Sequence, residues 1–172
     1  MPNSQSNPAR RPDETARLAS LQRYAILDTL PERIYDDVTA LASMICGTPI
    51  STVTLIDADR QWFKSAVGLQ SRQGAREHSF CAHTIETSVT LIVRDALEDP
   101  RFADNPLVTG EHRIRFYAGA PIITPEGHVL GTVCVIDTKP RTLTPIQITA
   151  LEALARHTMG LIATRQEMHS YS

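Results

Sequence analysis

Residues 50–67 read Ile50-Ser-Thr-Val-Thr-Leu-Ile-Asp57, then Ala-Asp-Arg60, then Gln61-Trp-Phe-Lys-Ser-Ala-Val67, and they carry the clearest structural pattern in the chain. Its first part is rich in β-branched residues, which favour strands. Its last part alternates with the period of a strand, which places Phe63 and Lys64 on opposite faces. The residues between the two parts have turn composition. The stretch therefore predicts a β-hairpin, whose strands pair antiparallel.

A second hairpin is predicted further along the chain. Its strands are residues 116–123 and 129–136, and its turn, residues 124–128, contains both Pro and Gly. Gly119 and Gly131 fall inside these strands, where a glycine indicates a bulge or a close approach of another group. One further short strand is predicted at residues 90–94.

Two helices are predicted before the first hairpin. The first runs from Pro12 to Tyr24, with an early proline and acidic residues that suit the helix dipole. Thr29 and Glu32 have the spacing of a capping box that opens the second helix, and Gly47 is in the position of a helix-ending glycine. The expected apolar face of this second helix consists of Ile34, Val38, Leu41 and Ile45.

A last helix is predicted after the second hairpin. Thr144 and Gln147 form another capping box, with Pro145 at the first helical position. The apolar stripe of this helix consists of Ile148, Leu151, Ala155 and Ile162. Because hairpins give an antiparallel sheet that helices must cover, the order of elements predicts the α+β class.

The composition is that of one globular domain. The 172 residues are 42% hydrophobic and 21% charged, with a net charge of -2. This balance provides no basic surface for nucleic acid or anionic membrane, and no apolar run approaches the ~20 residues of a membrane span. We expect a cytoplasmic protein with neither partner. Residues 1–11 are predicted to be a flexible tail, residues 12–168 the domain, and residues 169–172 a short tail.

The three cysteines, Cys46, Cys81 and Cys134, are odd in number and far apart. This spacing argues against a disulfide framework and against a structural zinc site. No metal site and no catalytic residue is predicted.

Five motifs, in order along the chain, resemble a subgroup of GAF domains found in bacterial signalling proteins. They are Arg60–Ser65 with Gly68-Leu69, Ser79–Ile85, Asp95-Ala96 with Asp99–Pro106, Ile114–Pro121, and Gly131–Asp137. The likeness extends from about Arg17 to Leu161.

The resemblance implies a GAF-like antiparallel sheet. One face would carry the first and last helices, which often form a dimer bundle in the family, and a middle segment would roof a pocket on the other face. It also implies a non-enzymatic sensor that binds a small molecule and signals to a histidine kinase or diguanylate cyclase output unit. No residues of this chain remain for such a unit, so the chain is either a free-standing GAF protein or a fragment.

The expected ligand-binding residues are the aromatic, thiol and polar side chains in the segments that the family uses around its pocket. They are Phe63, Phe80, Cys81, His83, Thr84, Asp95, Phe102, Arg115, Phe116, Tyr117 and Cys134. The expected residues of a homodimer interface are Leu18, Leu21, Leu151 and Ile162.

Cys81 and His83 are the strongest candidates for a reactive pair, because an imidazole beside a thiol favours the nucleophilic thiolate. A spacing of two residues, however, turns side chains apart on a helix. We interpret Cys81 as a small buried residue and His83 as hydrogen-bonded to the backbone, with contact to a ligand as the alternative.

Other functions are also compatible with the sequence. A purely structural dimerisation module would use the same helices without a ligand. Free methionine sulfoxide reductases are GAF enzymes, but the three cysteines do not match the pattern of that family. Bilin-binding relatives have His directly after Cys, whereas Ala82 separates Cys81 from His83. Haem ligation by His78, His83 or Cys81 has no fixed geometry, and the signature of cyclic-nucleotide-binding GAF domains is absent, so the cofactor is left unassigned.

Overall fold

A computed structural model describes residues 13–170. Two helices, α1 (Glu14–Arg23) and α2 (Arg33–Cys46), precede the hairpin of β1 (Ile50–Ile56) and β2 (Arg60–Val67). The middle segment consists of β3 (Gln73–Ala75), a 3-10 turn (Arg76–His78), α3 (Phe80–Thr87), β4 (Leu91–Val93) and α4 (Pro106–Thr109). The chain ends with β5 (Phe116–Ile123), β6 (Val129–Asp137) and α5 (Pro145–Ser170). The predicted tail of residues 1–11 and the predicted helix start at Pro12 lie outside the described residues.

The six strands form one antiparallel sheet in the order β3-β2-β1-β6-β5-β4. Both predicted hairpins are confirmed, and β1 and β6 pair at the centre of the sheet. The α+β class is therefore confirmed. The sequence predicted only a mixed middle segment with one strand. It did not predict the short elements β3 and α4 or the helix α3.

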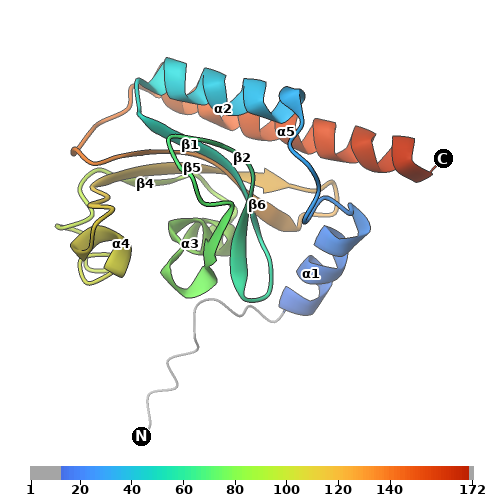
Figure 1. Ribbon diagram of the computed structural model, residues 1–172, viewed down its shortest axis with the longest axis horizontal. Coiled ribbons are helices and arrows are strands. Elements are labelled where there is room, and N and C mark those ends of the chain that lie inside the picture. The colour runs from blue at the N-terminus through green and yellow to red at the C-terminus, as the bar shows by residue number, and fades with distance from the viewer. Residues whose placement is uncertain (1–12, 171–172) are drawn as a thin grey trace, which may run out of the picture.

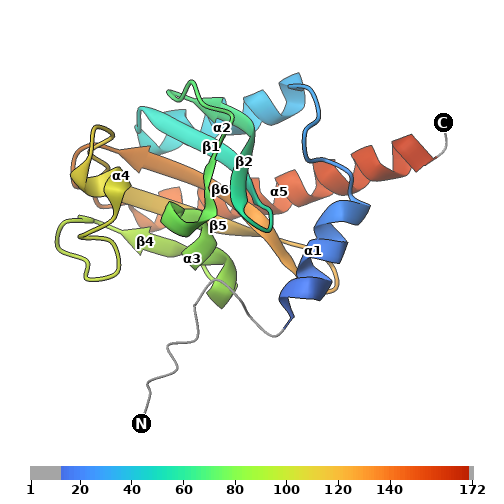
Figure 2. The ribbon, with the colours of Figure 1, turned by 60° about the horizontal axis from the view of Figure 1, so that its bottom comes forward.

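The helices form layers on the two faces of this sheet. α2 and α5 lie side by side on one face, and α3 and α4 lie under the other (Figure 1). Figure 2, which brings the α3 side forward, shows the middle segment wrapped across that second face. We call the face covered by α2 and α5 the helix face, and the face covered by α3, α4 and the middle segment the cavity face.

The helix that shares a face with α5 is α2, whereas α1 lies at one end of the sheet (Figure 1). The guanidinium of Arg17 fixes α1 there, because it donates to the carbonyl oxygens of Ile56 (2.8 Å) and Val129 (3.3 Å). Those two oxygens belong to the end of β1 and the start of β6.

Three of the four residues expected at a dimer interface lie inside the protomer. Leu21, Leu151 and Ile162 are 0%, 1% and 0% exposed in the core between the helices and the sheet, and Leu18 is half-buried. Their apolar stripe is used to cover the helix face of the sheet, so the expectation that these three side chains contact a partner is wrong.

α2 presents a different face to the sheet from the one its hydrophobicity predicted. Its buried side chains are Tyr35, Val38, Thr39, Ala42 and Cys46. Of the predicted face only Val38 is buried. The hydroxyl of Thr39 hydrogen-bonds Ser65 of β2 at 2.8 Å, which satisfies a polar side chain against the sheet and turns the apolar residues outward. The exposed apolar stripe consists of Ile34, Leu41, Met44 and Ile45.

The first predicted capping box is wrong, and α2 starts later than that box implies, with Glu32 instead of Thr29 at its N-cap position. The hydroxyl of Thr29 donates to the carbonyl oxygen of Ile26, and the carboxylate of Glu32 accepts from Lys64 at 2.6 Å. Lys64 Nζ also donates to Thr29 Oγ1 at 2.8 Å. A buried ammonium is a stronger donor than a backbone N–H, so it recruits both side chains away from the helix start.

The capping box of the last helix is confirmed. The backbone N–H of Gln147 donates to Thr144 Oγ1 at 3.2 Å, and the backbone N–H of Thr144 donates to Gln147 Oε1 at 2.8 Å. Gly47 ends α2 in the left-handed region with φ of 67°, as expected.

Candidate functional site

A cavity of about 140 Å³ lies between the cavity face of the sheet and the middle segment. Strands β1, β2, β5 and β6 form its floor and walls, α3 closes one side, and the loops before β3 and after α4 form its rim. Its lining residues are Ile50, Thr52, Thr54, Gln61, Phe63, Leu69, Ser71, Gln73, Gly74, Phe80, Cys81, Leu107, His112, Ile114, Tyr117, Cys134 and Ile136.

Strand alternation decides which side chains reach this cavity. In β6, Cys134 faces the cavity while its neighbours Val133 and Val135 pack in the core on the helix face. In β5, Tyr117 faces the cavity while Phe116 packs on the helix face. Phe116 is therefore separated from the cavity by the sheet itself, and its assignment to the ligand site is wrong.

A cluster of thiols and hydroxyls occupies the floor. The hydroxyls of Thr132 and Tyr117 donate to Cys81 Sγ at 3.0 and 3.3 Å, and Thr52 Oγ1 lies 2.9 Å from Cys134 Sγ. Cys81 and Cys134 both line the cavity, and Thr132 precedes Cys134 by two positions on the same face of β6. We call these five residues the thiol–hydroxyl cluster; all five side chains are buried.

The two thiols of the cluster differ in acidity. Burial raises the pKa of Cys81, but the hydrogen bonds from Cys134, Thr132 and Tyr117 outweigh burial and lower this pKa to about 7. The hydrogen bond to Cys81, followed by burial, raises the pKa of Cys134 well above its ordinary value. Cys81 is therefore the thiol that ionises first.

Gly119 allows Tyr117 to take its position in the cluster. A Cβ at residue 119 would lie 2.0 Å from the hydroxyl oxygen of Tyr117, so any larger side chain would displace the phenol. At residue 131 a Cβ would lie 1.8 Å from the carbonyl oxygen of Thr54. Both glycines thus mark close approaches, as the sequence indicated.

Five of the predicted ligand residues line the cavity: Phe63, Phe80, Cys81, Tyr117 and Cys134. Two more support it from behind. The hydroxyl of Thr84 lies 2.9 Å from the hydroxyl of Tyr117, and the ring of Phe102 stacks on that of Phe80 with centroids 4.2 Å apart.

Three predicted ligand residues lie outside the cavity lining: His83, Asp95 and Arg115. The ring of His83 packs edge-on against Phe102 with centroids 4.8 Å apart, on the side of α3 away from Cys81. The Asp95 carboxylate accepts from the backbone N–H of Leu97 in a turn. The guanidinium of Arg115 donates to the carbonyl oxygens at residues 108 and 114, which holds the end of α4. These three residues do not line the cavity, because local backbone groups engage two of them and helical spacing turns the third away.

Several cavity residues were missed in the sequence. Thr52 and Thr54 belong to a strand that was recognised, and Thr132, which donates to Cys81, lies two positions before Cys134, where period-two alternation would have placed it on the same face. Leu107 and His112 come from the irregular segment around α4, where no periodic signal identifies them.

Within residues 13–170, no group of three or more His, Cys, Asp or Glu side chains is arranged to hold a metal ion. In the same part of the chain, no helix combines the length and the hydrophobicity needed to cross a bilayer.

The sequence pattern of the GAF domain matches residues 14–162, which is most of the chain. The chain belongs to the GAF domain family. This agrees with the resemblance carried by the five motifs.

A curated relative of this GAF domain is a cyclic di-GMP phosphodiesterase of Pseudomonas aeruginosa. The two are 43% identical over 153 residues, which are 88% of this chain and 26% of the relative. The chain thus spans about a quarter of that protein's length, and the shared part is the GAF domain. The expectation that the protein is not an enzyme is contradicted by this relative, since a protein named for its catalytic activity contains the matching domain.

Solved structures show the same fold at low sequence identity. A GAF domain of a phosphoenolpyruvate-protein phosphotransferase from Coxiella burnetii has a TM-score of 0.67 at 16% identity, covering 96% of this chain and 99% of that one. The chromophore-binding domain of a bacteriophytochrome from R. palustris has a TM-score of 0.66 at 12% identity, covering 91% and 62%. At this identity the likeness establishes the fold and leaves the ligand open.

Proposed function

We propose that this GAF domain is a sensor that binds one small molecule in the cavity and passes the binding event to α2 and α5. The observation that carries the proposal is the cavity, in which apolar walls surround a buried thiol–hydroxyl cluster. Mostly apolar walls with a few placed polar groups are the usual form of a small-molecule site.

The size of the cavity restricts the ligand. An apolar cavity of about 150 Å³ holds a benzene molecule, and this cavity measures about 140 Å³. The ligand we propose is therefore a compact, mainly apolar molecule with one polar group that reaches Cys81 or Tyr117. A haem, a bilin or a cyclic dinucleotide exceeds this volume several-fold and is not proposed as its occupant.

A contact route connects the cavity to the helix face. Phe63 lines the cavity, and the next residue, Lys64, points to the helix face. Lys64 is the extra residue at a β-bulge, because Phe63 pairs with Thr54 and Ser65 pairs with Val53. Its ammonium binds Glu32 at the start of α2, and Glu32 Oε2 also accepts from Arg165 Nε of α5 at 3.0 Å.

A ligand that displaces Phe63 therefore acts on a strand whose bulge is tied to both helices. Only a difference in ligand affinity between two arrangements of β2 shifts their populations, and a coupling of about 1–3 kcal/mol changes affinity 5–150-fold. The name of the Pseudomonas aeruginosa relative supports a further part of the proposal, in which the output that the domain controls is cyclic di-GMP hydrolysis in a longer chain.

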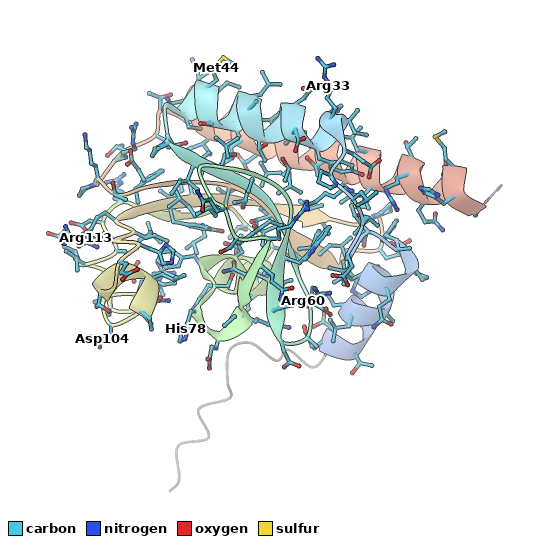
Figure 3. All side chains as sticks on the ribbon, in the orientation of Figure 1. Arg33, Met44, Arg60, His78, Asp104 and Arg113 are labelled. Carbon is cyan, nitrogen blue, oxygen red and sulfur yellow. The ribbon has the colours of Figure 1, made fainter. Side chains whose placement is uncertain are left out.

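The proposed sensor dimerises through the outer sides of α2 and α5. The exposed stripe of α2 includes Met44, which is 74% exposed, and Ile146 at the start of α5 is 80% exposed. Met44 and Arg33 project outward from α2, away from the sheet (Figure 3). A second copy of this chain is the proposed occupant, because two such stripes bury each other around a two-fold axis. This surface replaces Leu21, Leu151 and Ile162 as the proposed interface.

Binding of small probes tests the ligand proposal. Phenol, catechol and isobutanol are titrated while the methyl signals of Leu69, Leu107 and Ile136, which line the cavity, are followed by NMR. We expect saturable shifts of these methyls for at least one probe. Ser71→Trp, an exposed change at the rim, should abolish the shifts, whereas the exposed loop change Lys139→Trp should retain them. Equal binding by the Ser71→Trp variant would contradict the proposed site.

A further inference from the structure

Cys81 and Cys134 come from separate elements, α3 and β6, and meet at the floor of the cavity. The two thiols lie close together, because Thr132, whose hydroxyl donates to Cys81 Sγ at 3.0 Å, comes two positions before Cys134 on the same face of β6, and both cysteines belong to one buried cluster. All three cysteines, which lie within the described residues, are free and buried. Cys46 lies in the core on the helix face, so the sheet separates it from this pair.

We propose that Cys81 and Cys134 form a redox-sensing dithiol that hydroperoxides oxidise to an intramolecular disulfide. In the first step the Cys81 sulfur attacks one peroxide oxygen, the O–O bond breaks, and the products are Cys81 sulfenic acid and water or an alcohol. In the second step the Cys134 sulfur attacks the Cys81 sulfur, the S–O bond breaks, and water leaves with the Cys134 proton. Two thiols and one hydrogen peroxide thus give one disulfide and two waters.

The surroundings of the pair favour this order of steps. Two hydroxyls donate to Cys81 Sγ, from Thr132 at 3.0 Å and from Tyr117 at 3.3 Å, and such donors stabilise a thiolate. The higher pKa of Cys134 keeps that sulfur protonated and makes it the resolving thiol.

The oxidant has a route to the pair through the cavity. Both cysteines line the cavity, and its rim includes Ser71, Gln73 and His112, which are exposed. A hydrogen peroxide molecule is smaller than the proposed ligand and fits the same space. Cys46, which lies outside this cavity, has no such route through it.

Oxidation would change the floor of the cavity. A disulfide removes both S–H groups and draws the sulfur atoms together to a bond of about 2 Å. Thr132, Tyr117 and Thr52 would then lose their present sulfur partners. The inference does not depend on the proposed ligand, because the reaction needs only the two thiols and the hydroperoxide.

Peptide mapping of the unmodified protein tests the inference. The reduced protein is treated with hydrogen peroxide, denatured in the presence of an alkylating reagent, and digested without reductant for mass spectrometry. We expect a cross-linked pair of peptides containing Cys81 and Cys134, lighter by two hydrogens than the sum of the free peptides, together with alkylated Cys46. Alkylation of all three cysteines, or a disulfide that includes Cys46, would overturn the proposal.

Single cysteine variants separate the two steps. In Cys134→Ala the reaction should stop at Cys81 sulfenic acid, which dimedone traps, and in Cys81→Ala neither product should form. Cys46→Ala is the matched control, since it also removes a buried thiol but should leave the cross-link intact. Dimedone adducts on Cys134 instead of Cys81 would reverse the assigned order and contradict the mechanism. If a variant does not fold, the peptide map of the unmodified protein still shows whether Cys81 and Cys134 form the disulfide.

Discussion

Lys64 Nζ lies 2.6 Å from Glu32 Oε2, although Lys64 belongs to the strand that walls the cavity and Glu32 precedes α2. The Lys64 side chain is 0% exposed and that of Glu32 is 36% exposed. Burial lowers the pKa of Lys64 more than its pairing with Glu32 raises it. The pair therefore holds a charge that the protein interior disfavours, at the junction between the cavity strand and the helices.

The unequal burial of the pair predicts unequal effects of removing each partner. Glu32→Gln leaves a fully buried ammonium without its counter-ion and should lower the free energy of unfolding by about 3 kcal/mol. Lys64→Met replaces the ammonium with an apolar side chain of similar length and should stay within about 1 kcal/mol of wild type. Urea unfolding of both variants measures the difference. If both variants lose the same free energy of unfolding, the burial of Lys64 does not determine the cost of removing one partner.

The free energy of unfolding is also predicted to depend on pH through the Glu32 carboxyl. Burial raises its pKa, but the hydrogen bonds from Lys64 and Arg165 outweigh burial, and the pKa lies below its ordinary 4.5. Since the folded-state pKa is the lower one, the stabilisation is present above pH 4.5 and is lost as the pH falls through the folded-state pKa. The difference in unfolding free energy between wild type and Glu32→Gln should therefore shrink below pH 4.5. A constant difference across an acid series of urea titrations would disagree with this.

The sequence predicted the face of Lys64 but not its role. Strand alternation placed it opposite Phe63, and the bulge preserves this relationship. Its acceptors on Thr29 and Glu32 lie 35 and 32 positions earlier in the chain, so no local pattern reveals them. The same long-range contact explains why the capping box at the start of α2 was wrong.

Four of the five motifs contribute residues to the lining of the cavity, but not every residue chosen within them faces it. Phe116 and Tyr117 were both assigned to the ligand, although neighbouring residues of a strand face opposite ways. The helix α3 was also missed, although Ser79 caps it by accepting from the backbone N–H of Ala82 at 3.2 Å. The floor of the cavity depends on which strands pair, which is set by the whole sheet.

The two kinds of glycine in the chain give a stability test. Gly131→Ala places a Cβ 1.8 Å from the Thr54 carbonyl oxygen, so we expect severe destabilisation, seen as a loss of soluble folded protein. Gly160→Ala, in the exposed part of α5 with open space around it, should raise the free energy of unfolding by about 0.5–1 kcal/mol. Thermal unfolding checks both, and a stable Gly131→Ala protein would contradict the β1–β6 packing.

The hydroxyl of Tyr117 is predicted to keep Cys81 acidic. Tyr117→Phe removes one donor to Cys81 and should raise the pKa of that thiol, while stability falls by about 1 kcal/mol. Ultraviolet absorbance of the thiolate, followed through a pH titration in the Cys46→Ala background, measures the shift. Thr132→Val, which removes the other donor, should act in the same direction. An unchanged titration in both variants would disprove the role of these hydroxyls.

The proposed dimer surface is tested by charge substitutions. Met44→Asp and Leu41→Asp place a carboxylate on the exposed stripe of α2 and should shift sedimentation towards the monomer without loss of folding. Leu151→Asp puts the same charge in the core and should unfold the protein instead. Val89→Asp, at an exposed apolar position between α3 and β4, is the matched control and should leave the dimer intact. If both α2 variants still form the dimer, the exposed stripe of α2 is not part of its interface.

The proposed sensor holds a small molecule in the cavity beside Phe63, Cys81 and Tyr117. Native mass spectrometry of the protein taken directly from the cells that make it, compared with the Ser71→Trp variant prepared in the same way, tests it most directly. We expect an excess mass in the wild type that disappears on denaturation and is missing from Ser71→Trp. Wild-type protein with no excess mass, or the same excess mass in both proteins, would contradict it.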